Sequence, residues 1–358
     1  MLITVGLFIL GLVLLVLGAE WLVRGASRLA SAAGISPLVV GLTVVAFGTS
    51  APELAVTVSS SLQGTPDIAL GNVIGSNICN LLLILGLAAL IAPLTVAQQL
   101  VRLEVPLLIA ASLAMILMGW DGVISRTNGV VLFVAVVLYT IYAIWQSRRE
   151  QRAVQAEYER EFGPAADAAS PSILGNLALI VLGLVLLVLG ARWLVAGAVE
   201  AARWLGISEL VIGLTIIAIG TSLPEIAASV VASLRGERDI AVGNVVGSSL
   251  FNILAVLGIT ASVAPDGIPV SPAVLSFDLP IMLAATIACL PIFFTGYRID
   301  RWEGGVFLFY YSAYLTLLVL DAIEAEVLPM FELALIGFFV PLTLLTIATA
   351  SWRALRTK

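Results

Sequence analysis

Glu53 is an acid in the middle of an apolar stretch, with two hydroxyl side chains and a proline beside it. In a helix, Thr49, Ser50 and Glu53 share one face, because residues three or four positions apart are neighbours on the helix surface. Pro52 cannot donate the hydrogen bond that a helix requires at its position, so a break is expected there, with free carbonyls near Ala46 to Thr49. Carboxylate, hydroxyl and carbonyl oxygens together suit hard cations such as Ca²⁺ and Na⁺.

The same residues recur 172 positions later in the chain. GLTVVAFGTSAPE (41–53) returns as GLTIIAIGTSLPE (213–225), and DIALGNVIGSNICN (67–80) returns as DIAVGNVVGSSLFN (239–252). Without a gap, 36 of 63 positions are identical between 18–80 and 190–252, including polar residues that apolar segments do not match by chance. The two copies supply two sets of candidate ligands: Thr49, Ser50, Glu53, Ser76 and Asn80, and Thr221, Ser222, Glu225, Ser248 and Asn252.

A carboxylate inside a membrane span is costly and usually marks a functional site. A glycine–proline kink with hydroxyls bonded back to the helix would explain either motif alone as structure. Packing gives no reason to duplicate a buried acid together with its hydroxyl and proline neighbours. Glu53 and Glu225 are therefore predicted to converge at the midplane, where they would neutralise one Ca²⁺ or two monovalent ions.

Other polar residues of these segments are interpreted as structural, because helix caps, first-turn acids and cross-links between helices explain them. The three pairs are Asp67 with Asp239, Glu104 with Asp278, and Asn72 with Asn244. Gly71 and Gly75 lie on one stripe and are expected to permit close helix approach. Glu20 and Arg192 occupy equivalent positions with opposite charge, so they are not expected to share an ion-binding role.

The composition indicates a polytopic helical membrane protein. Of 358 residues, 61% are hydrophobic and 11% charged, with a mean hydropathy of +1.12, which no water-exposed surface could accommodate. The start of the chain lacks a basic region and a cleavage site and is interpreted as the first span. The 17 basic residues are scattered, which does not favour nucleic-acid binding. Eleven stretches read as spans, at roughly 2–32, 37–62, 67–92, 100–119, 123–146, 173–204, 209–234, 239–263, 272–294, 301–320 and 328–351.

The expected fold is all-α, with two inverted five-helix repeats and one extra C-terminal transmembrane helix. Because five is odd, the second copy must lie upside down in the membrane, as in secondary transporters whose substrate site lies between the copies. Basic residues gather on one side, so the positive-inside rule predicts an outside N-terminus and a cytoplasmic C-terminus in the cell (plasma or inner) membrane. The predicted units are the first repeat at 1–146, a cytoplasmic linker at 147–171, the second repeat at 172–322 and the extra helix at 327–351.

The motifs GTSAPE…GNVIGSNICN and GTSLPE…GNVVGSSLFN resemble the two α-repeats of the cation/Ca²⁺ exchanger superfamily, specifically its sodium/calcium exchanger branch of prokaryotic type. The resemblance covers roughly residues 1–322 and implies exchange of Na⁺ for Ca²⁺ by alternating access, with no cofactor besides the transported ions. It implies that Glu53 and Glu225 ligate Ca²⁺ with the carbonyls of Thr49 and Thr221. The implied sodium sites draw on Ala46, Thr49, Ser50, Glu53 and Ser76 and on Ala218, Thr221, Ser222, Glu225 and Ser248, with Asn80 and Asn252 completing the central site.

The chain departs from the family pattern at a few points. Some prokaryotic and potassium-dependent relatives carry Asp at the position of Asn252, so this chain keeps two central carboxylates, which argues mildly against K⁺ co-transport. Ser249 replaces the usual Asn of the second GSN motif, where an effect on packing is expected. The extra C-terminal helix is a further difference from ten-helix members.

Na⁺/Ca²⁺ antiport is the leading interpretation, and three alternatives stand beside it. H⁺/Ca²⁺ exchange needs only that the glutamates protonate, but the proton-coupled branch usually places its essential acids in GNxxE motifs. A passive channel is disfavoured, because channels typically build rings of ligands from identical subunits. An enzyme is disfavoured by the absence of histidine and by Cys79 and Cys289, which lie in apolar segments without a nucleophile–base pattern. The oligomeric state is not predicted.

Overall fold

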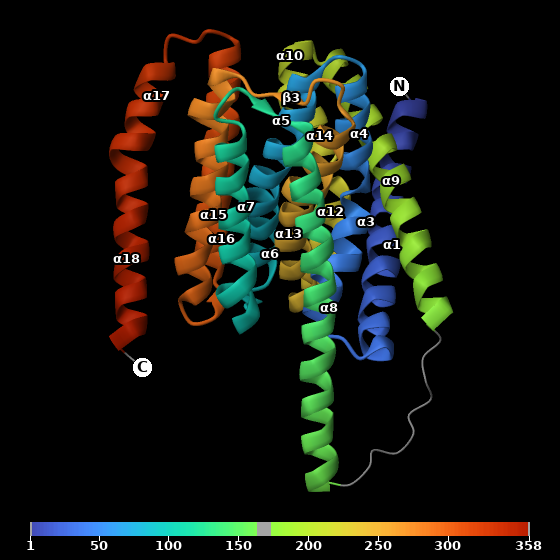
Figure 1. Cartoon of the computed structure of the whole chain (residues 1–358). Coiled ribbons are helices and arrows are strands. Elements are labelled where there is room, and N and C mark those ends of the chain that lie inside the picture. The colour runs from blue at the N-terminus through green and yellow to red at the C-terminus, as the bar shows by residue number, and fades with distance from the viewer. Residues whose placement is uncertain (1, 163–172, 357–358) are drawn as a thin grey trace.

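The computed structural model describes residues 2–162 and 173–356, which lie almost entirely in long helices packed side by side (Figure 1). The helices of the first copy are α1 (Leu2–Ala33), α2 (Pro37–Val40), α3 (Ala46–Thr49), α4 (Ala51–Leu62), α5 (Pro66–Ile78), α6 (Leu85–Ile91), α7 (Val105–Met118) and α8 (Arg126–Phe162). Those of the second copy are α9 (Ile173–Trp204), α10 (Glu209–Ile212), α11 (Ala218–Gly220), α12 (Leu223–Leu234), α13 (Arg238–Phe251), α14 (Gly258–Val263), α15 (Leu279–Phe294) and α16 (Arg301–Ala322). The chain then continues through α17 (Leu328–Ala334) and α18 (Val340–Arg356).

Short π-helical turns join or begin many of these helices, and they recur at equivalent places in the two copies. They lie at Gly41–Val45, Cys79–Ile84 and Leu100–Glu104, then at Gly213–Ile217, Asn252–Leu257 and Val274–Asp278, with one more at Leu335–Phe339. Such turns insert an extra residue into a helix and are frequent at functional sites. The duplication seen in the sequence therefore extends to irregularities of the backbone.

The bounds of the helical spans agree with those predicted from hydropathy to within a few residues, except that α8 is longer. Nine helices of the described chain are long and apolar enough to cross a membrane, or ten if the bent pair Pro37–Thr49 and Ala51–Leu62 is one span. The equivalent pair in the second copy, α10–α11 with α12, is not among them. The total of eleven spans therefore stays a prediction, as does the division into units.

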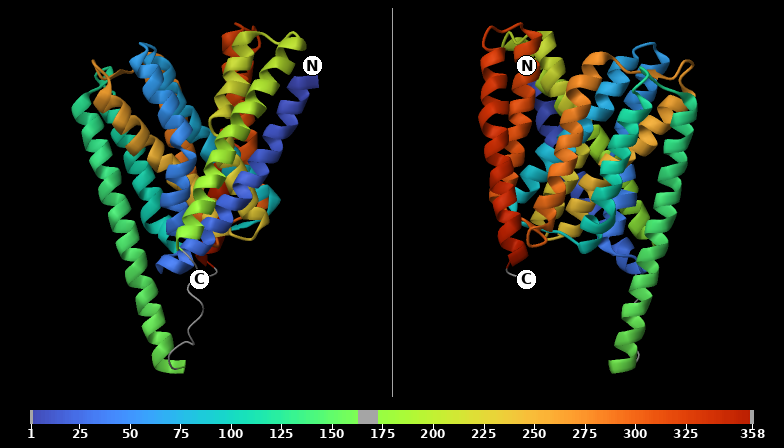
Figure 2. Two further views of the ribbon diagram at one scale, coloured as in Figure 1. Left: turned by 90° about the vertical axis from the view of Figure 1, so that its right-hand side faces the viewer. Right: turned by 60° about the vertical axis from the view of Figure 1, so that its left-hand side comes forward.

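α8 continues to Phe162, so residues 147–162 of the predicted linker at 147–171 are helical, while residues 163–172 lie outside the described residues. Its far end projects beyond the other helices (Figures 1 and 2). The start of α1 lies at one end of the molecule, and the end of α18 lies at the other, on the side of this projection (Figure 1). This arrangement agrees with an N-terminus and a C-terminus on opposite sides of a membrane.

The first helices of the two copies, α1 and α9, lie side by side and antiparallel (Figure 2). An added Cβ at Gly11 would meet the Gly190 carbonyl at 2.8 Å, and one at Gly18 would meet the Gly183 carbonyl at 2.7 Å. These backbones approach so closely that only glycine fits. The contact is reciprocal, because Gly183 and Gly190 are the duplicates of Gly11 and Gly18.

Two short pairs of antiparallel strands also cross between the copies. β1 (Leu94–Thr95), after α6, pairs with β4 (Arg298–Ile299), before α16. β2 (Val123–Ile124), before α8, pairs with β3 (Ile268–Pro269), after α14. In each pair, the strand that follows the third span of one copy meets the strand that precedes the fifth span of the other copy, as an inverted duplication requires.

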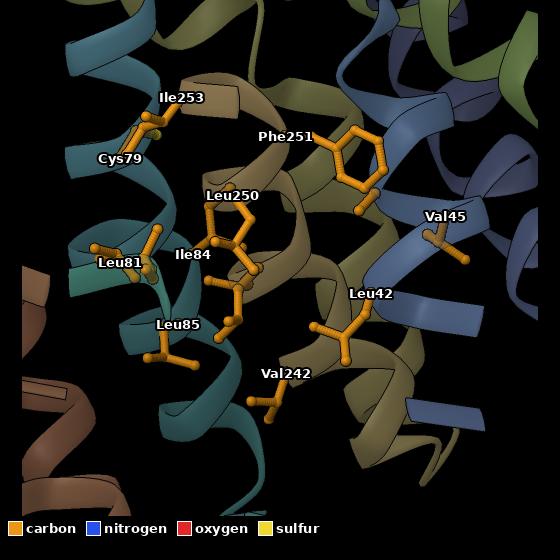
Figure 3. Packing of buried hydrophobic residues seen from close by; sticks show 14 of the residues in the cluster. Leu42, Val45, Cys79, Leu81, Ile84, Leu85, Val242, Leu250, Phe251 and Ile253 are labelled. Atoms are coloured by element: carbon orange, nitrogen blue, oxygen red, sulfur yellow. The ribbon is translucent and has the colours of Figure 1, made fainter. Parts of the chain in front are cut away.

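The third span of each copy forms the centre of the molecule. The most apolar part of α13 and α14 is completely buried, and that of α5 and α6 is largely buried. Leu42, Ile84 and Leu250, from three different spans, belong to one buried apolar cluster (Figure 3). This core surrounds the helices that carry the duplicated polar motifs.

α17 and α18 lie at the edge of the bundle (Figure 1). Tyr310 of α16 holds them by donating from Oη to Thr343 Oγ1 at 2.7 Å and to the Phe339 carbonyl at 3.1 Å. None of the most apolar window of this span is buried, so its surface is suited to lipid.

Charged residues tie α1 to the second copy. Glu20 accepts a hydrogen bond from Arg235 Nε at 2.8 Å, just after α12, and also pairs with Arg24. Ser27 Oγ donates to Glu237 Oε1 at 2.8 Å in the same region. Arg192, the counterpart of Glu20, forms no ion pair with any described residue, so the two positions differ in role as the sequence predicts.

Candidate cation site

The spans that carry the two glutamates break at the predicted places. In the first copy, α3 ends at Thr49 and α4 begins at Ala51, with a bend of 43° between the two halves. In the second copy, α11 ends at Gly220 and α12 begins at Leu223. Each glutamate therefore lies in the first turn of a helix, where the backbone N–H groups favour a negative charge.

The carbonyl of Ala46 is not free as expected. It accepts the backbone N–H of Ser50 at 3.0 Å and the hydroxyl of Thr49 at 3.3 Å. The last turn before Ser50 still closes its helical hydrogen bond, so the Ala46 carbonyl lies before the break. Ala46 thus offers a carbonyl that already has two partners.

Ten of the twelve predicted site residues are buried. Glu53 is 1% exposed and Glu225 is 0% exposed. Thr221 is half-buried, and Ala218 is exposed. The buried residues are Ala46, Thr49, Ser50, Glu53, Ser76, Asn80, Ser222, Glu225, Ser248 and Asn252.

Hydrogen bonds cross between the two copies at the glutamates. Ser50 Oγ donates to Glu225 Oε1 at 3.2 Å, and Ser222 Oγ donates to Glu53 Oε1 at 3.3 Å. The serine of each GTSxPE motif thus contacts the glutamate of the other copy. The structure therefore brings together the two acids that the sequence places 172 residues apart.

Several buried polar atoms of this region have no hydrogen-bond partner among the described residues. They are Glu53 Oε2, Glu225 Oε2, Ser76 Oγ and both side-chain polar atoms of Asn80 and Asn252. Buried polar atoms without partners are costly and rare, so each requires an explanation. A cation among these oxygens would give the carboxylates, hydroxyl and amide carbonyls a partner, and the all-oxygen set fits Ca²⁺ or Na⁺.

A second polar network surrounds the glutamates, centred on Asn72 and Asn244. Asn72 Nδ2 donates to Thr57 Oγ1 at 2.9 Å and to the Glu53 carbonyl at 3.4 Å. Thr221 Oγ1, from the other copy, donates to Asn72 Oδ1 at 3.3 Å. The interpretation of this asparagine as a cross-link between helices is confirmed.

Asn244 makes the equivalent contacts in the second copy. Its Nδ2 donates to Ser229 Oγ at 2.9 Å and to the Glu225 carbonyl at 3.4 Å, and Thr49 Oγ1 donates to its Oδ1 at 3.1 Å. Thr57 and Ser229 were missed in the sequence. They follow the glutamates by four residues and share the offset of 172, which is the signal that could have found them.

The remaining polar residues lie elsewhere. Asp67 and Asp239 are in first turns but are not N-caps, because Thr65 and Glu237 hold the cap positions. Glu104 accepts a hydrogen bond from Gln99 Nε2 at 2.7 Å, and Asp278 accepts one from Tyr314 Oη at 3.0 Å. None of these four acids has a hydrogen bond, among those described, to a residue of the candidate site.

The expectation of close helix approach at Gly71 and Gly75 is wrong for this structure. No described atom lies within 4 Å of a Cβ added at either position. Their duplicates do make close contacts, because a Cβ at Gly243 would lie 2.8 Å from the Leu38 carbonyl and one at Gly247 would lie 2.7 Å from Leu42 Cα. The two GNxxG segments are thus packed differently.

Comparisons with known proteins show the family to which the chain is similar. The profile of a family described as "Sodium/calcium exchanger protein" matches residues 3–145 and 175–320. Inner membrane protein YrbG of Escherichia coli is 41% identical over 289 residues, which cover 80% of this chain and 87% of YrbG. Sodium/calcium exchanger MaX1 of Methanosarcina acetivorans is 32% identical over 342 residues, which cover 87% and 97% of the two chains.

A solved structure has the same fold. The sodium-calcium exchanger NCX_Mj, soaked with zero Na⁺ and Ca²⁺, superposes with a TM-score of 0.74 at 31% identity. The superposition covers 90% of this chain and 99% of that one.

Proposed function

This chain belongs to the sodium/calcium exchanger protein family and is a cation/Ca²⁺ antiporter, and we propose that the ion it exchanges for Ca²⁺ is Na⁺. The crossed contacts Ser50–Glu225 and Ser222–Glu53 carry this proposal, because they join two acids from inverted copies in one buried, all-oxygen cluster. One Ca²⁺ balances two carboxylates, and Na⁺ prefers the same oxygens. The two ions therefore compete for one place.

Exchange, rather than leak, follows from the charge of that cluster. Two buried carboxylates without a cation are strongly disfavoured, because their desolvation and mutual repulsion are not offset. Switching between the outward-open and inward-open states of the transporter is therefore unfavourable while the cluster is empty. The transporter can switch when either Ca²⁺ or Na⁺ is bound. After Ca²⁺ is released on one side of the membrane, Na⁺ must therefore bind before the site can reopen to the opposite side.

The proposed ligands keep their assigned roles. Glu53 and Glu225 bind Ca²⁺ together with the carbonyls of Thr49 and Thr221. The sodium positions use Ala46, Thr49, Ser50, Glu53 and Ser76 of one copy and Ala218, Thr221, Ser222, Glu225 and Ser248 of the other, while Asn80 and Asn252 complete the centre. Ala46 and Ala218 have the least support, since the first carbonyl has two partners and the second residue is exposed.

The test is uptake of ⁴⁵Ca²⁺ into proteoliposomes under imposed ion gradients. An outward-directed Na⁺ gradient is expected to drive uptake, whereas a K⁺ or pH gradient of equal size is not. Liposomes with the Glu53→Gln/Glu225→Gln protein measure the leak. Uptake that ignores Na⁺ and follows the pH gradient would establish the proton-coupled alternative instead.

We also propose that α1 begins outside the cell and that the end of α8 and the C-terminus are cytoplasmic. The distribution of basic residues supports this orientation, since most of them fall on the side of Arg148 and Arg149.

A further inference from the structure

We propose that Asn72 and Asn244 are positioning residues for ion exchange, each of which orients the motif threonine of the opposite copy; this inference rests on the proposed function. Neither asparagine is a ligand in the proposed set. Each contacts a threonine that is, namely Thr221 or Thr49.

Chemistry fixes the orientation of the Asn244 amide. The backbone carbonyl of Glu225 can only accept a hydrogen bond, so the amide nitrogen must face it and Ser229. The amide oxygen then faces the Thr49 hydroxyl at 3.1 Å, which is also within hydrogen-bond distance of the Val45 and Ala46 carbonyls of its own helix. This contact between the copies holds Thr49 in position, and the backbone carbonyl of Thr49 is a proposed Ca²⁺ ligand.

The Asn72 amide is fixed in the same way. Its nitrogen faces the carbonyl of Glu53 and the hydroxyl of Thr57, and its oxygen receives the proton of Thr221. Each amide therefore joins three segments: its own helix, the glutamate helix of its own copy, and the motif of the opposite copy. The position of the motif threonine in one copy therefore depends on the backbone of the glutamate helix in the other copy.

The two contacts differ in burial and in length. Asn244 and Thr49 are both 0% exposed, and their hydrogen bond is 3.1 Å long. Asn72 and Thr221 are half-buried, and theirs is 3.3 Å long. Water competes less in the first contact, so changes at Asn244 are expected to have the larger effect.

The test is a set of double-mutant cycles read from Ca²⁺/Ca²⁺ exchange, in which ⁴⁵Ca²⁺ enters liposomes loaded with unlabelled Ca²⁺. This assay needs no counter-ion, so it remains valid even if the proposed coupling to Na⁺ fails. Thr49→Val and Asn244→Ala are each expected to raise the half-saturating Ca²⁺ concentration about 3- to 10-fold, the value of one buried hydrogen bond. Because both remove the same contact, the double variant is expected to be no worse than the more damaging single one.

The chain provides matched controls. Thr49 with Asn72, and Thr221 with Asn244, share no hydrogen bond among those described, so their effects should multiply. Thr49→Ser keeps the hydroxyl and should restore the affinity that Thr49→Val loses. Effects that multiply in all four combinations would overturn the proposal, as would coupling within a copy instead of between copies.

A gentler substitution covers the case in which Asn244→Ala does not fold. Ser229→Ala removes only one partner of the amide nitrogen and is expected to raise the half-saturating concentration in a manner that is non-additive with Thr49→Val. Additivity of this pair would show that the amide does not act through Thr49.

Discussion

Glu53 and Glu225 are two buried acids, each of which accepts a hydrogen bond from the motif serine of the opposite copy. Replacing either by glutamine keeps the shape and removes one charge from the cation. Loss of one partner from a buried ion pair costs about 3–5 kcal/mol, so Ca²⁺ uptake is expected to fall at least about 100-fold. The melting temperature should stay the same or rise, since removing a buried charge relieves desolvation and repulsion.

Glu104→Gln is the matched control for this substitution. Glu104 is also a fully buried acid, but its described hydrogen bond is to Gln99. The half-saturating Ca²⁺ concentration should stay at the wild-type value, although expression or stability changes. Near-normal exchange by either Glu53→Gln or Glu225→Gln would refute the paired-carboxylate site.

Asn252 leaves the central cluster with two acids, and Asn252→Asp would add a third. A third carboxylate adds one more group to which a proton can bind in competition with the cation. The rate of exchange is therefore expected to fall more steeply at acid pH in the variant than in the wild type. Asn80→Asp, at the equivalent position of the first copy, should act in the same direction. Uptake measured between pH 5.5 and 8.5 tests this, and unchanged profiles for both variants would remove the amides from the cluster.

At the residue level, the sequence predicts which side chains are in the site but not how they pair. Duplication of Ser50, Glu53 and Asn72 is visible as an offset of 172. The crossing of each serine to the other copy's glutamate depends on how two inverted segments meet in space, which no spacing along the chain encodes. Thr57 and Ser229 were missed because a hydroxyl in a helix is normally satisfied by its own backbone.

At the level of elements, hydropathy gives the spans well because the bilayer fixes their length. Pro52 and Pro224 likewise mark the two breaks. The π-helical turns were not predicted, since one extra residue in a helix leaves no mark in composition. The sequence predicts Asp67 as an N-cap, but Pro66 occupies the first helical position and the cap position falls to Thr65.

The glycines of the GNxxG segments give a prediction at this level. Gly247 packs against the first bent span, whereas its duplicate Gly75 faces open space. Alternating access in inverted repeats exchanges the environments of the two copies, so Gly75 is expected to become close-packed in the opposite state. Gly75→Ala should then leave the melting temperature unchanged and slow maximal exchange, because overpacking costs about 1–3 kcal/mol in that state alone.

Gly247→Ala is the matched comparison for the Gly75 variant. Its Cβ would lie 2.7 Å from Leu42 Cα, so the protein should melt at a lower temperature. Thermal melting and the maximal rate of ⁴⁵Ca²⁺ exchange separate the two effects. Wild-type turnover by Gly75→Ala would show that this segment stays open throughout the cycle.

At the level of the whole molecule, an odd number of helices per copy is enough to predict inversion. The sequence could not show the contacts that hold the copies together, such as the pairing of Leu94–Thr95 with Arg298–Ile299. Those strands are two residues long, too short for any periodic pattern. The tie between Glu20 and Arg235 was missed for a similar reason, since ion pairs between distant residues follow from the fold alone.

The orientation of the molecule is testable because both native cysteines are buried, at 2% and 1% exposure. Gln155→Cys and Arg356→Cys should react with an impermeant maleimide in inside-out vesicles and not in intact cells. A cysteine at Asp121, between α7 and α8, should react in intact cells. Labelling of position 155 or 356 from outside would reverse the proposed topology.

The neutral amides of Asn80 and Asn252 also decide how the exchanger meets an electric field. The described chain has no cluster of three or more histidines, cysteines or acids that could hold a metal ion, so Glu53 and Glu225 are the two acids of this cation site. With one Ca²⁺ or two Na⁺ the loaded site is electrically neutral, and with a third Na⁺ it is positive. Each charge moved across 100 mV is worth about 2.3 kcal/mol. If more than two Na⁺ return for each Ca²⁺, the whole current flows in the sodium half of the cycle, and membrane voltage leaves the calcium half untouched.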